Sequence, residues 1–114
     1  MPPISFNPVA RRSTNGYALS LKENKLFKEG LVIIADYQTE GKGQRGGGWE
    51  SAKGKNLIIS VVIEPKTSVE DQFNISKISA FSVMDLLHSL GVKSKIKWPN
   101  DILVGKHKIA GILI

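Results

Sequence analysis

The fold is decided by residues 31–63, which read LVIIADYQTEGKGQRGGGWESAKGKNLIISVVI. Two apolar runs, residues 31–35 and 57–63, enclose a segment that is dense in glycine. Short, continuous apolar runs with β-branched residues are typical of strands that are buried on both faces. We therefore predict a strand, a long glycine-rich loop and a second strand, with Pro65 ending the second strand.

The loop itself suggests a ligand. Residues 40–49, EGKGQRGGGW, contain five of the eleven glycines in the chain. Glycine loses more backbone entropy on ordering than any other residue, so this run does not serve stability. Successive N–H groups in glycine-rich backbone form an anion-binding nest, to which Lys42 and Arg45 add charge and Trp49 adds a wall. We predict a loop that closes over an anionic ligand. A floppy hairpin loop is the alternative.

Three familiar phosphate loops do not fit these residues. Gly41, Gly43 and Gly46 have the spacing of the dinucleotide fingerprint, but that fingerprint opens directly into a helix. Here more glycines follow, and the next strand begins near Leu57. No register supplies a Walker A loop, and residues 57–63 lack the lysine that follows a kinase glycine loop.

The rest of the chain adds helices and strands on both sides. Residues 1–12 are expected to be an extended lead-in. Ser13, Thr14 or Asn15 is expected to cap a helix that runs to about Lys25. Apolar residues recur every three positions from Ile75 to Leu90, which predicts an amphipathic helix with a broad buried face.

Ser68 and Asp71 suit a capping box at the start of this second helix, and Gly91 suits its end. Residues 95–98, 102–104 and 108–114 are predicted strands, the last two joined by a turn at Gly105-Lys106. The fold class expected is α/β, more exactly α+β, with a mixed, largely antiparallel sheet flanked by helices.

Composition limits the classes of function. The 114 residues suit one small domain, and the absence of cysteine excludes disulfides, thiolate metal sites and a cysteine nucleophile. No membrane span or signal peptide is expected, which favours the cytoplasm. The net charge of +6 gathers in residues 41–56 and 93–108. This distribution indicates an anionic ligand or a nucleic-acid face, with a solvated basic surface as the alternative.

A second polar cluster, residues 97–101, reads KWPND. The oxygens of Asn100 and Asp101 suit Mg²⁺, which takes one or two protein carboxylates together with substrate phosphates. An Asx-turn between strands is the alternative. Seven residues later, Lys108 precedes the small pair Ala110-Gly111, where close backbone approach would let the lysine hold a carboxylate.

KWPND at 97–101, followed by KIAGIL at 108–113, resembles the paired signature of biotin protein ligases. Ser13-Thr14-Asn15, Gln38 and the loop from Gly41 to Trp49 occur in the order and spacing of that family, so the resemblance covers residues 13–114. It implies an enzyme that activates biotin with MgATP to biotinyl-5′-AMP and transfers biotin to a lysine of a carboxyl carrier domain. It also implies a fold related to class II aminoacyl-tRNA synthetases.

The resemblance also implies roles for individual residues. The expected biotin-binding residues are Ser13, Thr14, Asn15, Gln38, Gly41, Gly43, Gln44, Gly46, Trp49, Lys108 and Gly111. The expected ATP-binding residues are Lys42, Arg45, Lys97, Asn100 and Asp101, of which Asn100 and Asp101 would also hold Mg²⁺. The expected catalytic residues are Lys108, Arg45 and Lys42. Gln44 stands where the family commonly has a cation.

The family's catalytic domain continues with further strands and an SH3-like domain, so residues 13–114 are expected to be part of a longer protein. The DNA-binding domain that some members carry is not expected before Ser13. An oligomer is compatible with the sequence, and no membrane partner is expected. Two alternatives stay open: a related lipoate-protein ligase and a basic nucleic-acid-binding module.

Overall fold

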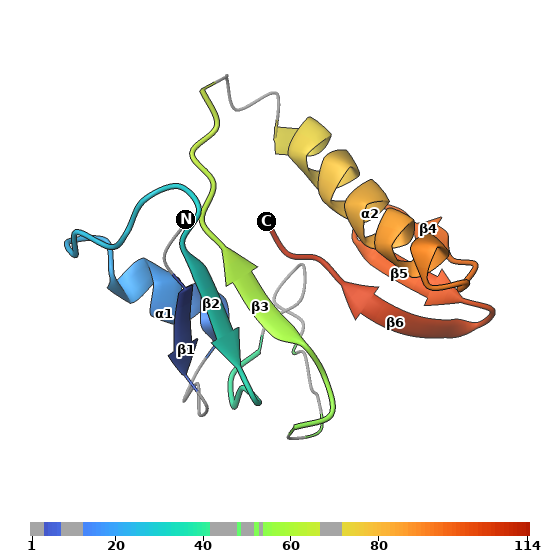
Figure 1. Cartoon of the computed structure of the whole chain (residues 1–114), viewed down its shortest axis with the longest axis horizontal. Helices are drawn as coiled ribbons and strands as arrows, with labels where there is room; N and C mark the ends of the chain where they lie inside the picture. Colours follow the sequence, from blue (N-terminus) through green and yellow to red (C-terminus); the bar gives the residue numbers. More distant parts are fainter. Residues whose placement is uncertain (1–3, 8–12, 42–47, 49–51, 53, 67–71) are drawn as a thin grey trace. The chain divides into compact units, whose positions relative to one another are not determined.

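The computed structural model of the chain describes residues 4–7, 13–41, 48, 52, 54–66 and 72–114. Its residues divide into two compact units, Met1–Pro65 and Lys66–Ile114. The two units hold eight elements between them in the described part of the chain (Figure 1).

The first unit is a three-stranded sheet with one helix. It contains β1 (Ile4–Asn7), α1 (Thr14–Ser20), β2 (Val32–Ala35) and β3 (Ile58–Val61). The strand order is β1-β2-β3, with β1 parallel and β3 antiparallel to β2. Strand β1 was not predicted, since these four residues were expected to belong to the extended lead-in. Their sequence pattern is weak, and the pairing with β2 is what makes them a strand.

Helix α1 packs on β2 and β3 and covers one face of this sheet. The core consists of Ala18, Leu31 and Ile33, with Tyr17, Leu21, Phe27 and Val62 packed around it. The prediction of strands buried on both faces is wrong for β3, where burial alternates and Ile59 and Val61 are 45% and 52% exposed. Among the described residues, therefore, only one face of β3 is buried.

The first helix is shorter than predicted, since it ends at Ser20 rather than near Lys25. Leu21 N–H donates to the carbonyl of Ala18. This i→i+3 bond is of the tighter 3₁₀ type and marks the end of the α-helix. Asn24 Oδ1 then accepts a hydrogen bond from Leu26 N–H at 2.9 Å. Such Asx-turns compete with helical hydrogen bonding, which explains why the helix does not continue.

The second unit contains α2 (Gln72–Ser89), β4 (Lys95–Lys97), β5 (Asp101–Val104) and β6 (His107–Gly111). Its three strands form an antiparallel sheet in the order β4-β5-β6. Of the four strand pairings in the described part of the chain, three are antiparallel, which confirms the mixed, largely antiparallel character. The strands belong to two sheets rather than one, and β6 ends at Gly111 instead of continuing to residue 114.

The predicted ends of α2 and of the last hairpin depend on two glycines. Gly91 has φ +80°, and the N–H groups of Gly91 and Val92 donate to the carbonyls of His88 and Leu87 in a Schellman motif. Gly105 has φ +60° in the turn between β5 and β6. Both predictions are confirmed. The capping box at Ser68 and Asp71 lies outside the described residues.

The predicted broad buried face of α2 is wrong for the described residues. Ala80 is the buried residue of this helix, whereas Ile78, Phe81 and Leu86 are 65%, 50% and 58% exposed. The helix packs on β5, whose Ile102 is fully buried. A three-stranded sheet of short strands covers only a narrow stripe of an eighteen-residue helix.

Candidate functional site

The start of α1 holds three of the expected ligand-binding residues. Ser13 is the N-cap residue of the helix, and its Oγ accepts a hydrogen bond from Gly16 N–H at 2.8 Å. This interaction satisfies one of the unpaired N–H groups in the first helical turn. The prediction that a residue of Ser13-Thr14-Asn15 caps the helix is confirmed. The cap also fixes the directions in which the side chains of Thr14 and Asn15 project from the backbone.

Thr14 and Gln38 are brought together although they are 24 residues apart. Gln38 Oε1 accepts a hydrogen bond from Thr14 N–H at 3.0 Å and lies 3.5 Å from Thr14 Oγ1. Thr14 is only 4% exposed, and Gln38 is half-buried. The amide oxygen of Gln38 is thereby occupied, while its NH₂ group is the part that remains suited to a ligand.

The same cluster contains a residue that the sequence analysis missed. Ser60 on β3 is 7% exposed, and its Oγ lies 2.6 Å from Thr14 Oγ1 and contacts Asn15 Oδ1. Ser60 pairs with Ile33 across the sheet and shares the buried, α1-facing side with it. The signal that could have found it is a single hydroxyl in an otherwise apolar strand, because a buried polar group requires a partner.

The base of the glycine-rich loop belongs to the same unit. Asp36 follows β2, and its carbonyl accepts a hydrogen bond from Gly54 N–H at 3.1 Å. This bond joins the two ends of the loop. Gly41 is half-buried and Gly48 is exposed. Six other residues expected in the site lie outside the described part of the chain: Lys42, Gly43, Gln44, Arg45, Gly46 and Trp49.

In the second unit, the turn between β4 and β5 is held by aromatic packing. The ring of Trp98 lies 6.5 Å from that of Phe73 and 6.1 Å from that of Phe81, the second pair edge to face. Such aromatic pairs add stability beyond the area that they bury. The Trp98–Pro99 peptide bond is cis. Trp98 therefore packs the turn against α2, a role that no specific signal in the sequence indicated.

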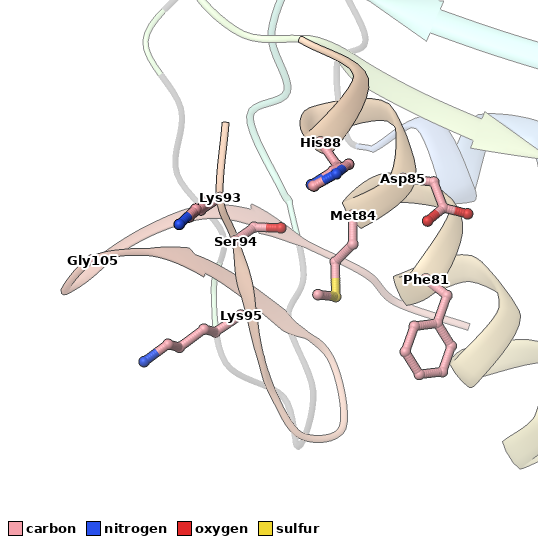
Figure 2. A pocket seen from close by; sticks show the side chains of 8 residues that line it. All are labelled: Phe81, Met84, Asp85, His88, Lys93, Ser94, Lys95 and Gly105. Carbon is pink, nitrogen blue, oxygen red and sulfur yellow. The ribbon is translucent and has the colours of Figure 1, made fainter. Parts of the chain in front are cut away.

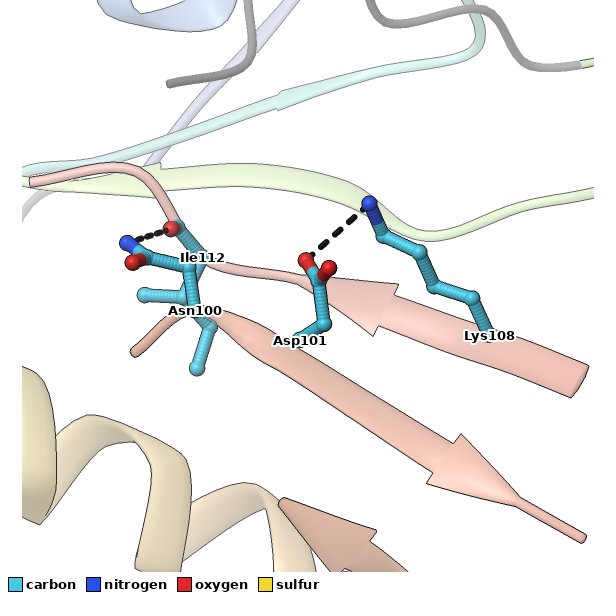
Figure 3. A network of polar contacts seen from close by, with 4 residues as sticks. All are labelled: Asn100, Asp101, Lys108 and Ile112. Carbon is cyan, nitrogen blue, oxygen red and sulfur yellow. Dashed lines mark hydrogen bonds and ion pairs between the residues drawn. The ribbon is translucent and has the colours of Figure 1, made fainter. Parts of the chain in front are cut away.

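Asn100 ties this turn to the end of β6 (Figure 3). Its Nδ2 donates to the carbonyl of Ile112 at 2.6 Å, and its own carbonyl accepts from Ile112 N–H at 2.9 Å. Asn100 is 8% exposed, and its Oδ1 is buried without a hydrogen-bond partner. An unpaired buried acceptor is costly, so this oxygen is a candidate for binding a ligand or ion.

Asp101 and Lys108 form an ion pair, with Lys108 Nζ 3.0 Å from Asp101 Oδ1 (Figure 3). Their side chains are 26% and 41% exposed, respectively. The pair depends on an irregularity in the ladder. Ile102 pairs with Ala110 but Leu103 pairs with Lys108, so Ile109 has no partner residue.

This β-bulge decides which way Lys108 faces. Residues 101 and 103 point to one face of β5, and Leu103 pairs with Lys108. Without the bulge, the register would move Lys108 opposite Val104 and onto the other face of the sheet. The bulge therefore places the lysine and the carboxylate on the same face, opposite α2 (Figure 3).

Asn100 and Asp101 fit Mg²⁺ as a partial site. They offer one carboxylate and one amide oxygen that has no partner. Magnesium commonly uses one or two protein carboxylates while substrate phosphates and water complete its shell. The described residues contain no group of three or more His, Cys, Asp or Glu side chains that could enclose an ion without such help.

The remaining expected residues of this unit lie on the same strands. Gly111 pairs with Asp101 across the ladder, so the residue beside the carboxylate has no side chain. Lys97 pairs with Asp101 from the other neighbouring strand and is exposed. The second unit thus brings Lys97, Asp101, Lys108 and Gly111 onto adjoining positions of one sheet.

A groove of about 650 Å³ lies elsewhere in this unit. Figure 2 shows its lining residues, which come from α2, the segment before β4, the first residue of β4 and the turn at Gly105. They are Phe81, Met84, Asp85, His88, Lys93, Ser94, Lys95 and Gly105. None of the expected site residues is among them, so the groove is not the candidate site. Among the described residues, no helix is both long and apolar enough to cross a membrane.

Comparison with known proteins gives consistent results. Residues 8–114 match the model of the Biotin/lipoate A/B protein ligase family. Over 103 residues the chain is 36% identical to the bifunctional ligase/repressor BirA of Escherichia coli strain K12, a match that covers 90% of this chain and 32% of the relative. The chain thus spans about a third of the length of that curated relative.

Solved structures agree. A biotin acetyl coenzyme A carboxylase synthetase from Helicobacter pylori, with bound biotinylated ATP, aligns with a TM-score of 0.77 and 29% identity over 99% of this chain and 54% of its own. A biotin protein ligase from Aquifex aeolicus, in complex with biotin and ATP, aligns with a TM-score of 0.79 and 26% identity over 99% of this chain and 46% of its own. The expected fold is confirmed.

Proposed function

This chain belongs to the biotin/lipoate A/B protein ligase family, and from that premise we propose that it forms the biotin-binding part of a biotin protein ligase. The enzyme would activate biotin with MgATP to biotinyl-5′-AMP and then transfer biotin to a lysine of a carboxyl carrier domain. A cytoplasmic location belongs to the same proposal. The observation that carries the proposal is the polar network in which Thr14 bonds to Gln38 and Ser60 contacts both Thr14 and Asn15.

The chemistry requires no protein nucleophile. A biotin carboxylate oxygen attacks the α-phosphorus of ATP, and pyrophosphate leaves. The ε-amino group of the acceptor lysine then attacks the acyl carbon, and AMP leaves. Catalysis in such a reaction comes from positioning the substrates and from stabilising the developing phosphoryl charge. When bound, Mg²⁺ neutralises phosphate charge.

We assign the two steps of recognition to the two units. Thr14, Asn15 and Gln38 would hydrogen-bond the polar ring of biotin. Lys108 would meet the biotin carboxylate or the adenylate linkage, and Asp101 holds its ammonium group on the correct face of the sheet. Lys97 and Asn100 would contribute to the ATP site. As part of this proposal, Lys42 and Arg45 keep their expected roles in ATP binding and catalysis, and Trp49 keeps its role as a wall of the pocket.

Biotin is favoured over lipoate by the polarity of the network. The cyclic urea of biotin offers two N–H donors and a carbonyl acceptor, whereas the dithiolane ring of lipoate offers no conventional donor and only weak acceptors. A cluster of hydroxyl and amide groups discriminates strongly against a ligand that leaves those groups unpaired. The family match likewise favours a ligase over the nucleic-acid-binding module.

Calorimetric titration of the protein with biotin and with lipoate tests the proposal. We expect saturable biotin binding and far weaker lipoate binding. Thr14→Val removes the hydroxyl at nearly constant volume and should weaken biotin binding, with Ser20→Ala as the control because Ser20 is exposed on the same helix. Binding of lipoate alone would reject the choice of biotin.

A further inference from the structure

Ser60 is the centre of the polar cluster, yet it has no expected role in ligand binding. Its hydroxyl contacts Thr14 Oγ1 at 2.6 Å and also contacts Asn15 Oδ1. Ser60 is 7% exposed and Thr14 is 4% exposed, whereas Asn15 is exposed. Ser60 thus contacts two of the expected ligand-binding residues, Thr14 and Asn15, and can act on a ligand through them.

The protons in this cluster can be assigned by counting donors. A serine hydroxyl carries one proton, so Ser60 donates to Asn15 or to Thr14 but not to both at once. The amide oxygen of Asn15 only accepts, whereas the Thr14 hydroxyl can donate. Both contacts are hydrogen bonds together only when Thr14 donates to Ser60 and Ser60 donates to Asn15.

The contact between Thr14 and Gln38 is consistent with this direction. Thr14 Oγ1 lies 3.5 Å from Gln38 Oε1 but only 2.6 Å from Ser60 Oγ, so the threonine proton is better placed toward the serine. Gln38 Oε1 still has a partner, because Thr14 N–H donates to it at 3.0 Å. With this assignment, every contact in the cluster is a hydrogen bond except the longest, between Thr14 Oγ1 and Gln38 Oε1.

We propose that Ser60 is a positioning residue that sets the hydrogen-bonding polarity of the ligand site, a role that rests on the biotin ligase function proposed above. With its own proton committed to Ser60, Thr14 presents oxygen lone pairs and accepts from a ligand N–H. With its oxygen committed to Ser60, Asn15 presents its NH₂ group and donates to a ligand carbonyl. One acceptor beside one donor matches a cyclic urea and does not match a dithiolane.

The test compares the unsubstituted protein with Ser60→Ala, Ser60→Thr and the control Ser20→Ala. Ser20 is an exposed serine whose hydroxyl donates to the carbonyl of Tyr17. Removing that hydroxyl therefore leaves the cluster unchanged. Ser60→Thr keeps the hydroxyl and suits a strand. Each protein is titrated with biotin and with a tetrahydrothiophene that carries the same valerate chain but no urea.

We expect Ser60→Ala to weaken biotin binding by about tenfold while leaving the affinity for the urea-free analogue nearly unchanged. Ser60→Thr should restore most of the biotin affinity, and Ser20→Ala should bind like the unsubstituted protein. Equal losses for both ligands in Ser60→Ala would mean a merely structural role and would overturn the proposal. So would unchanged biotin binding, or a failure of Ser60→Thr to restore affinity.

A measurement without ligand separates this inference from the proposed function. The side-chain amide signals of Asn15 in ¹⁵N–¹H spectra should be shifted and slow to exchange in the unsubstituted protein and in Ser60→Thr, and should approach those of a free amide in Ser60→Ala. If biotin does not bind the unsubstituted protein, the ligase function fails on its own. If the Asn15 side-chain amide signals are the same in Ser60→Ala as in the unsubstituted protein, the positioning role is rejected, whether or not biotin binds.

Discussion

Among the described residues of 1–65, the polar side chains of the candidate site are neutral, and Thr14 and Ser60 are buried, whereas the site residues in 66–114 are mainly charged and partly or fully exposed. Thr14 and Ser60 are 4% and 7% exposed, against 26% and 41% for the side chains of Asp101 and Lys108. A buried neutral network is costly to disrupt, because each lost partner leaves another group unsatisfied. An exposed ion pair contributes little to stability.

Under the proposed function, this difference corresponds to two separate tasks. Recognition of a neutral, polar ring benefits from fixed hydrogen-bonding groups that hold one geometry. Binding a carboxylate and a triphosphate requires charged side chains that the substrate can reach and that are not needed to stabilise the fold. Asn100 is the exception within the second unit, because it is buried and bonded to Ile112 like a member of the first network.

The largest expected effect is on catalysis at Lys108. Lys108→Ala should lower biotin-dependent pyrophosphate release by about 10²–10³-fold, because it removes a cation from the charge that develops in the transition state. The free energy of unfolding should change by less than about 1 kcal/mol, since the pair with Asp101 is partly exposed. Lys106→Ala, in the exposed turn of the same hairpin, is the control. Near-normal pyrophosphate release by Lys108→Ala would exclude this role.

A smaller effect, on stability, is expected at Asn100. Asn100→Ala removes the hydrogen bond to the carbonyl of Ile112 and leaves that carbonyl unpaired, so the free energy of unfolding should fall by about 1–3 kcal/mol. Urea denaturation measures the change. Asn56→Ala, at an exposed position, should stay within about 0.5 kcal/mol of the unsubstituted protein. Equal stability of the two variants would show that Asn100 does not join the turn to β6.

The helix cap should have a still smaller effect. Ser13→Ala removes the acceptor for Gly16 N–H and should lower the free energy of unfolding by about 1 kcal/mol. Ser20→Ala changes the same residue type at the other end of α1 and should cost less, because Ser20 is exposed. A biotin affinity that falls more than the stability would show that Ser13 also contacts the ligand.

The smallest effect expected is the coupling between Asp101 and Lys108. A double-mutant cycle with Asp101→Ala and Lys108→Ala should give a coupling free energy of about 0–1 kcal/mol in urea denaturation, falling with added salt. Both single variants should nevertheless lose most of their adenylate formation, as expected above for Lys108→Ala, because each removes charge compensation at the reacting groups. A coupling free energy of several kcal/mol would instead show that the ion pair stabilises the fold. It would contradict the proposed difference between the two units.

Local signals in the sequence predicted several features correctly. The Ser13 cap, the end of α2 at Gly91 and the turn at Gly105 each depend on a few neighbouring residues, whose conformations are set by short-range sterics and hydrogen bonds. The grouping of Thr14 with Gln38 came from the resemblance rather than from any local pattern, and the structure places them in contact.

Features that depend on distant partners were missed or wrong. Strand β1 was not predicted because its formation depends on the edge of β2. The apolar run of β3 looked buried on both faces, but only one face is covered in the described unit. The bulge at Ile109 leaves no mark in the sequence, although it decides which face carries Lys108.

By itself, the sequence determined the kinds of residue available and the positions of most elements, because periodicity, caps and glycine turns act over short distances. It also determined, through KWPND and KIAGIL, the family that the chain resembles. Only the tertiary structure decided that Ser60 meets Thr14 and Asn15, and that Lys108 meets Asp101. Those contacts follow from strand register and from the packing of α1 on its sheet, which join residues far apart in the chain.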